Sequence, residues 1–176
     1  HRPEGAFYVY PDISGLIVQN ARCWLNEPES PEWTTGYFVT EEKFEDESTL
    51  EGMARPRIDV HIERNIRRPR PRFVFEAKRL HRSDSVAQYV SEKGLGALRD
   101  GTYASNTGAA GMLGYVQRGE VSDWADKVRG KLDRERAPHG LDVEGVVWTE
   151  TVLDARLGPT RKSRHTIPGR TAIAVY

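Results

Sequence analysis

Residues 57–80 read RIDVHIERNIRRPRPRFVFEAKRL, a stretch in which two strand-like segments, 57–63 and 72–79, flank an arginine- and proline-rich linker. Apolar side chains recur at every second position of both segments: Ile58, Val60, Ile62, Phe73 and Phe75. This period of two is typical of strands with one apolar face. Pro69 and Pro71 cannot donate hydrogen bonds to a ladder, so the linker stays outside the sheet. The stretch therefore predicts two neighbouring strands joined by a short connection.

The rest of the chain shows alternating helical and strand patterns separated by turn-forming residues. The expected elements are helices at 12–25, 83–100 and 122–137, and strands at 37–42, within 106–119, at 143–153 and at 166–176. With the two strands above, the order is α-β-β-β-α-β-α-β-β, which predicts an α/β sandwich with a central mixed β-sheet flanked by helices. A length of 176 residues with 38% apolar content predicts a single domain over residues 1–176, with its core at about 12–153.

The charges of the chain cancel overall but are unevenly distributed. Residues 1–54 contain three basic and eleven acidic side chains, whereas residues 55–82 contain ten basic and three acidic ones. The basic middle segment indicates a local cationic surface that would suit nucleic-acid phosphates. The alternative is that the acidic and basic segments pair with each other, and charge alone does not distinguish the two.

The cysteine and histidine residues favour a reducing compartment and do not indicate a zinc site. Cys23 is the only cysteine, and it is expected to be a buried, inert thiol on the first helix. A lone cysteine, the absence of a long apolar run and an opening HRPEGAF unlike a signal peptide predict a cytoplasmic protein that does not enter a membrane. His61, His81, His139 and His165 lack the spacing of a zinc site and are expected to lie on the surface.

The segment FVFEAKRL carries the candidate chemistry. Glu76 and Lys78 are two residues apart in a strand, so both side chains leave the same face of the sheet. If the preceding strand pairs antiparallel, Asp59 comes next to Glu76, and two carboxylates can then share a hard cation such as Mg²⁺. Lys78 beside them could orient a water molecule or stabilise charge on a phosphate. The alternative without function is that Asp59, Glu76 and Lys78 form an exposed pattern of charges across two strands. However, burying a charged pair directly after three apolar residues costs free energy unless the pair faces a polar site.

These residues resemble the PD-(D/E)xK nuclease superfamily, and the resemblance covers roughly residues 12–118. The two half-motifs are Arg57-Ile58-Asp59, with isoleucine where proline is usual, and Glu76-Ala77-Lys78. The resemblance implies a restriction endonuclease-like fold and a magnesium-dependent endonuclease, with Mn²⁺ able to substitute. It also implies catalytic roles for Asp59, Glu76 and Lys78, metal ligation by Asp59 and Glu76, and a further acidic ligand from the preceding segment. Glu42 is favoured for that position over Glu41 and Glu51.

Nucleic acid, DNA rather than RNA, is the expected partner. The candidate phosphate contacts are Arg57, Arg79, Arg68 and Arg70, although the linker arginines could equally be solvated loop residues. The resemblance further implies a product with a 5′ phosphate and is compatible with a homodimer or a targeting subunit in a restriction or phage-defence system. Two alternatives stay open. One is a catalytically silent relative that binds nucleic acid or protein, and the other is an unrelated α/β domain in which the motif is accidental.

Overall fold

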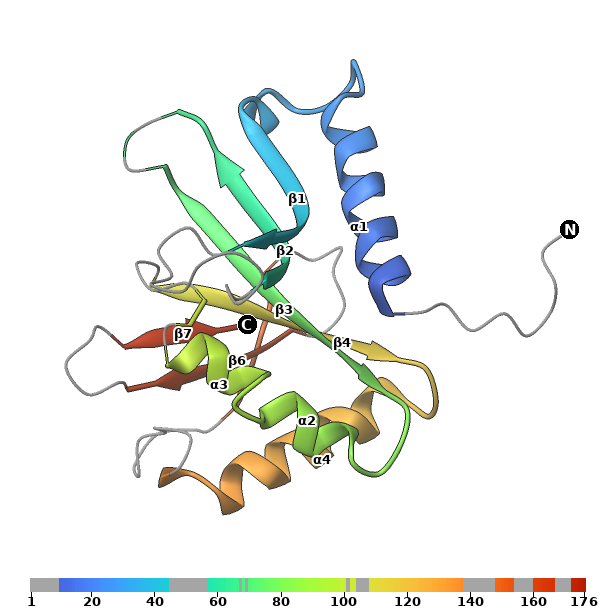
Figure 1. Cartoon of the computed structure of the whole chain (residues 1–176), viewed down its shortest axis with the longest axis vertical. Helices are drawn as coiled ribbons and strands as arrows, with labels where there is room; N and C mark the ends of the chain where they lie inside the picture. Colours follow the sequence, from blue (N-terminus) through green and yellow to red (C-terminus); the bar gives the residue numbers. More distant parts are fainter. Residues whose placement is uncertain are drawn as a thin grey trace, which may run out of the picture.

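A computed structural model describes residues 10–44, 57–66, 68, 70–100, 102–103, 108–137, 148–153, 160–166 and 172–176. Its described part is a mixed α/β structure built on a seven-stranded sheet in the order β1-β2-β3-β4-β7-β6-β5 (Figure 1). The predicted mixed α/β class is therefore confirmed. Six strands were expected, and the seventh arises in the C-terminal third of the chain.

The first three strands form an antiparallel meander. They are β1 (Tyr37–Phe44), β2 (Arg57–Arg64) and β3 (Arg72–Leu80). The strand β4 (Ala109–Val116) then pairs with β3 in parallel, so the chain must cross over between them through helices. The predicted pair of strands in residues 57–80 is confirmed, with pairs from Glu63 and Arg72 at the hairpin end to Val60 and Phe75.

Helices cover both faces of this meander. On one face α1 (Tyr10–Leu25) packs over a small core of Val18, Val39 and Val60. On the other face lies the larger core, to which α2 (Ser85–Val90), α3 (Leu95–Arg99) and α4 (Val121–Arg134) contribute. Figure 1 shows α1 beside β1, and α2 together with α4 at the far end of β3. The sheet therefore has two separately packed faces. The alternation in β3 predicts them, but Ile58 of β2, expected on the same face as Val60 and Ile62, belongs to the larger core instead.

The prediction of a single helix at 83–100 is wrong, because the two short helices α2 and α3 occupy this stretch. Ser91, which follows α2, has an extended backbone with ψ of 173°. Gly94 precedes α3, and a Cβ atom at this glycine would lie 2.3 Å from the Tyr89 carbonyl oxygen. The chain turns back on itself too closely for any other side chain, and this approach breaks the helix.

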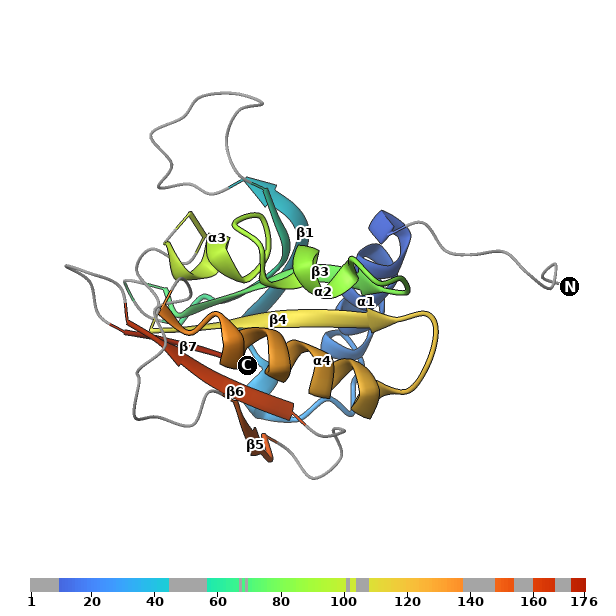
Figure 2. The same cartoon turned by 90° about the horizontal axis from the view of Figure 1, so that it is seen from below.

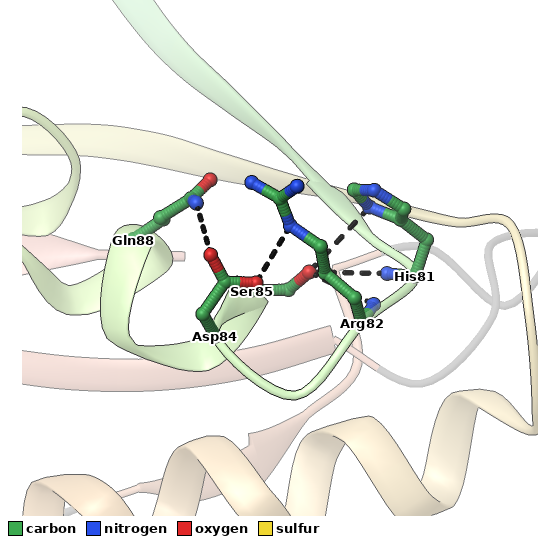
Figure 3. Close-up of polar contacts among 5 residues, drawn as sticks. All are labelled: His81, Arg82, Asp84, Ser85 and Gln88. Carbon is green, nitrogen blue, oxygen red and sulfur yellow. Dashed lines mark hydrogen bonds and ion pairs between the residues drawn. The ribbon is translucent and has the colours of Figure 1, made fainter.

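Ser85 anchors the connection between β3 and α2 (Figure 3). Its hydroxyl oxygen accepts hydrogen bonds from the backbone N–H groups of His81 at 3.2 Å and Arg82 at 3.1 Å. Asp84, the residue before α2, makes no capping hydrogen bond with its side chain. It contacts Arg82 Nε at 2.6 Å and accepts a 2.8 Å hydrogen bond from Gln88. The end of β3, the strand that carries Glu76 and Lys78, is thus tied to a buried serine.

The C-terminal part contains β5 (Thr149–Thr151), β6 (Thr160–His165) and β7 (Ile173–Val175), which continue the sheet beyond β4 (Figure 2). The expected strands at 143–153 and 166–176 correspond in part to β5 and β7, while residues 143–147 and 167–171 lie outside the described part. The strand β6 was missed because its sequence, TRKSRH, contains no apolar residue. Its buried face consists of Ser163 and His165, whose Oγ and Nε2 atoms are 2.8 Å apart.

Three single-residue expectations were wrong for reasons of packing. Cys23 is exposed, because the inner side of α1 runs through Ser14, Val18, Ala21 and Leu25 at helical spacing. His61 and His165 are buried within strands rather than lying on the surface.

No helix among the described residues combines the length and apolar character required to cross a bilayer.

Candidate active site

The candidate site lies where the ladder between β2 and β3 ends. Pairing runs from Glu63 and Arg72 to Val60 and Phe75. One residue further along β2, the Asp59 carboxylate accepts a hydrogen bond of 2.8 Å from the backbone N–H of Ala77. A side chain therefore takes the place of a ladder bond at this point, and Asp59 is held beside the strand that carries Glu76.

Glu76 and Lys78 point to the same face of β3, as predicted. Val74 and Leu80 are an even number of residues from both Glu76 and Lys78, so they lie on the same face, and they are buried in the larger core. Phe75 lies on the opposite face and packs on the α1 side. The Lys78 ammonium donates a hydrogen bond to Glu76 Oε1 and forms an ion pair with it. Glu76 is only 5% exposed. The site therefore contains a nearly buried carboxylate with a partly exposed cation attached to it.

The electrostatics of the site confirm that its two acids are neighbours. Burial, and next the negative charge of Asp59, raise the pKa of Glu76 to about 7, although the charge of Lys78 opposes the shift. A buried carboxyl group with a like-charged neighbour is unfavourable in isolation. A cation placed between the two acids would remove this repulsion.

The charges of these acids also raise the pKa values of two tyrosines, which the sequence did not indicate. The pKa of Tyr103 is raised by burial and then by Glu76 and Asp59. The pKa of Tyr115 is raised by burial and by Asp59, while a hydrogen bond with Ser14 opposes the shift. The Ser14 and Tyr115 oxygens are 3.1 Å apart. No motif could have indicated these residues, because they come from loop 102–103 and strand β4.

The acidic residues proposed to complete a metal site have different positions. Glu41 pairs with Val60 and so belongs to the α1 side, where its Oε2 lies 2.7 Å from the position of a Cβ at Gly15. Glu42 falls between the pairs Glu41–Val60 and Lys43–Ile58, which places its backbone opposite Asp59. Its side chain, and Glu51 as a whole, lie outside the described part. Whether Glu42 or Glu51 contributes a ligand stays a prediction.

The carboxylates of Asp59 and Glu76 are the candidate metal ligands among the described residues. Within that part of the chain no group of three or more His, Cys, Asp or Glu side chains could hold a metal ion. Mg²⁺, however, commonly binds through one or two carboxylates and keeps several waters. The adjacent carboxylates of Asp59 and Glu76 supply oxygen ligands of this kind, with a raised pKa at Glu76 that a bound cation would reverse.

The predicted arginine contacts fall into two groups. Arg57 and Arg79 are exposed on the two strands that carry the acids, within three residues of Asp59 and Glu76 respectively. Arg68 and Arg70 lie at the hairpin tip, beyond Arg64, which is itself about 17 Å from Asp59 at the usual rise of a strand. Arg70 also donates to Glu63 Oε1 at 2.6 Å. The structure therefore does not bring the tip arginines next to the carboxylates.

Comparison of the chain with protein-family models, with curated proteins and with solved structures gave no match. Interpretation of the site therefore depends on its own residues and geometry.

Proposed function

We propose that this chain is a metal-dependent nuclease that hydrolyses phosphodiester bonds in nucleic acid, with DNA the favoured substrate. One observation carries the proposal. Two carboxylates from adjacent strands are held side by side, one of them nearly buried, with a lysine on the same face. This arrangement costs stability unless a cation compensates for it, and such costs are typical of functional sites.

Each side chain has a defined task in this proposal. Asp59 and Glu76 hold Mg²⁺, for which Mn²⁺ can substitute, and Glu42 is the candidate for an additional ligand. The bound metal supplies Lewis-acid polarisation of the phosphoryl group. Lys78, held against Glu76 by its ion pair, orients the attacking water or stabilises the negative charge that develops on the phosphate. Arg57 and Arg79, which are exposed on the same two strands, are the candidate contacts to phosphates on either side.

The order of elements supports a restriction endonuclease-like architecture. A helix precedes an antiparallel meander, the acids lie at the end of the β2–β3 ladder, and α2 and α3 lead to the parallel strand β4. This assignment brings with it a 5′-phosphate product and a role in restriction or phage defence. The same resemblance is compatible with a homodimer or a separate targeting subunit that selects the DNA sequence.

The direct test is cleavage by the purified chain. Supercoiled plasmid, linear duplex and single-stranded DNA are incubated with Mg²⁺, with Mn²⁺ or with a chelator. We expect metal-dependent cleavage that Lys78→Ala abolishes and that Lys93→Ala, which changes an exposed lysine near α3, leaves intact. Cleavage that persists in Lys78→Ala would remove the assignment of this site.

A catalytically silent relative is the second candidate. It is favoured by one observation: among the described residues, no group of three or more His, Cys, Asp or Glu side chains could hold a metal ion. Such a module would bind nucleic acid or a protein equally well before and after Lys78→Ala, would show no turnover with either metal, and would give no heat of Mn²⁺ binding by calorimetry.

A further inference from the structure

A cluster of aromatic side chains lies at the end of the meander opposite the candidate active site. It consists of Trp24 in the last turn of α1, Trp33 in the 3-10 helix η1 (Glu32–Thr34) and Tyr37 at the start of β1. The ring centroids of Trp24 and Trp33 are 5.8 Å apart, and those of Trp33 and Tyr37 are 6.2 Å apart. The Arg64 guanidinium lies 4.9 Å from the centre of the Tyr37 ring.

This aromatic cluster is exposed rather than part of a core. Trp33 is 56% exposed and Trp24 39%, although each contacts another ring. The larger and smaller cores of the protein contain neither tryptophan. Large aromatic side chains that remain accessible while held by one another are typical of binding surfaces.

The backbone around the cluster is fixed by hydrogen bonds. Ser30 Oγ donates to the Trp24 carbonyl oxygen, and the Thr34 N–H donates to the Pro31 carbonyl oxygen at 2.8 Å. Gly36 has φ of +81°, which allows its carbonyl oxygen to accept from the Asn65 N–H at 2.8 Å. The loop carrying Trp33 is thereby attached to the hairpin carrying Arg64, so the rings are organised before any ligand binds.

The charges around the cluster are asymmetric. The hairpin side carries Arg64, Arg68 and Arg70, the last paired with Glu63 at 2.6 Å, while the loop side carries Glu27, Glu29 and Glu32. A ligand with flat apolar groups and an anionic backbone fits this arrangement. Its flat groups can stack on the rings, and its anionic backbone can run along the arginines, away from the glutamates. Single-stranded nucleic acid has this chemistry, because its unpaired bases stack on aromatic rings and its phosphates pair with cations.

We propose that the aromatic cluster, centred on Trp33, is a platform on which unpaired bases of a single-stranded nucleic acid segment stack. The inference rests on the proposed nuclease function and narrows its substrate class to one with a single-stranded part. Tyr37 and Arg64 are register partners on the α1 side, while Glu76 and Lys78 face the other core. The platform is thus an accessory binding site, separated from the carboxylates by roughly the length of the hairpin.

The test measures binding without cleavage. Fluorescein-labelled oligothymidylate and a blunt duplex of equal length are titrated with the full chain in chelator, and fluorescence anisotropy gives the affinities. We expect Trp33→Ala to weaken single-strand binding about tenfold, in line with the loss of one stacked base. Trp33→Phe, which keeps a ring, should retain most of the affinity. Phe38→Ala is the matched control, because Phe38 is also 56% exposed but belongs to none of the ring pairs.

The outcomes separate this inference from the nuclease assignment. Trp33-dependent single-strand binding without cleavage under any condition would support the platform while contradicting the nuclease. Metal-dependent cleavage together with identical affinities for the native chain and Trp33→Ala would overturn the platform and leave the nuclease intact. Equal losses in Trp33→Ala and Phe38→Ala would also overturn it, as would a dimer that dissociates on Trp33→Ala without any loss of single-strand affinity, which would identify a protein interface.

Discussion

The carboxylate of Asp59 accepts a hydrogen bond from the backbone N–H of Ala77, 2.8 Å away, between the two residues of the Glu76–Lys78 pair. Asp59 therefore has a structural task in addition to any metal ligation. Its carboxylate satisfies a donor at the point where the β2–β3 ladder ends, and the same contact holds it beside Glu76.

This double role predicts different results for two substitutions of Asp59. Asp59→Ala removes the carboxylate that accepts from the Ala77 N–H, and it should lower the free energy of unfolding by about 1–2 kcal/mol as well as abolishing cleavage. Asp59→Asn keeps an acceptor oxygen, so it should lose activity with a much smaller change in stability. Urea unfolding and plasmid cleavage measure the two effects. Equal destabilisation by both variants would show that the Ala77 contact is unimportant.

Glu76 should destabilise the metal-free fold at neutral and alkaline pH. Its pKa rises from 4.5 to about 7 on folding, so the folded state binds more protons than the unfolded state between these values, and stability falls as pH rises through this window. Glu76→Gln should therefore stabilise the metal-free chain by roughly 1–3 kcal/mol at pH 8 and by little at pH 4.5. The lost ion pair with Lys78 will reduce the gain. Thermal unfolding at both pH values is the measurement, and a gain independent of pH would contradict the assignment.

Metal binding should be linked to the same proton. A cation that binds Glu76 must displace the proton that the carboxyl group holds below about pH 7, so the affinity for Mn²⁺ should fall about tenfold per pH unit below pH 7 and level off above it. Calorimetry in buffers of different ionisation enthalpy will report the released proton directly. Tight binding that does not vary between pH 5.5 and 7 would indicate ligands other than Glu76.

Any side chain at residue 111 should lower the stability of the fold for steric reasons. Gly111 pairs with Phe75 across β3 and β4, and a Cβ atom at residue 111 would lie 2.2 Å from the Phe75 ring. Gly111→Ala should cost about 1–3 kcal/mol of stability, because the ring must shift within the packed α1 side. Gly108→Ala is the control, since a Cβ at that position has no neighbouring atom within 4 Å. Similar urea midpoints for the two variants would contradict the packing argument.

Local sequence patterns were enough to predict the strands of the site and the direction of its side chains. Alternation with a period of two located β2 and β3 and assigned Glu76 and Lys78 to one face, because side chains alternate in direction along a strand. It did not assign Ile58, which packs in the larger core although Val60 and Ile62 pack on the α1 side. It also predicted the mixed α/β class from the order of the segments. The same rule failed for β6, where Ser163 and His165 take the inward positions that apolar residues usually hold.

Contacts between residues far apart in the chain could not be predicted from local patterns. The end of the β2–β3 ladder at Asp59, the approach of Tyr103 to both carboxylates and the exposure of Trp33 all depend on packing between elements far apart in the chain. The inner side of α1, and with it the outward position of Cys23, was likewise selected by contact with Val39 and Val60. Local periodicity defines the faces of an element, but burial depends on the neighbouring element that covers each face.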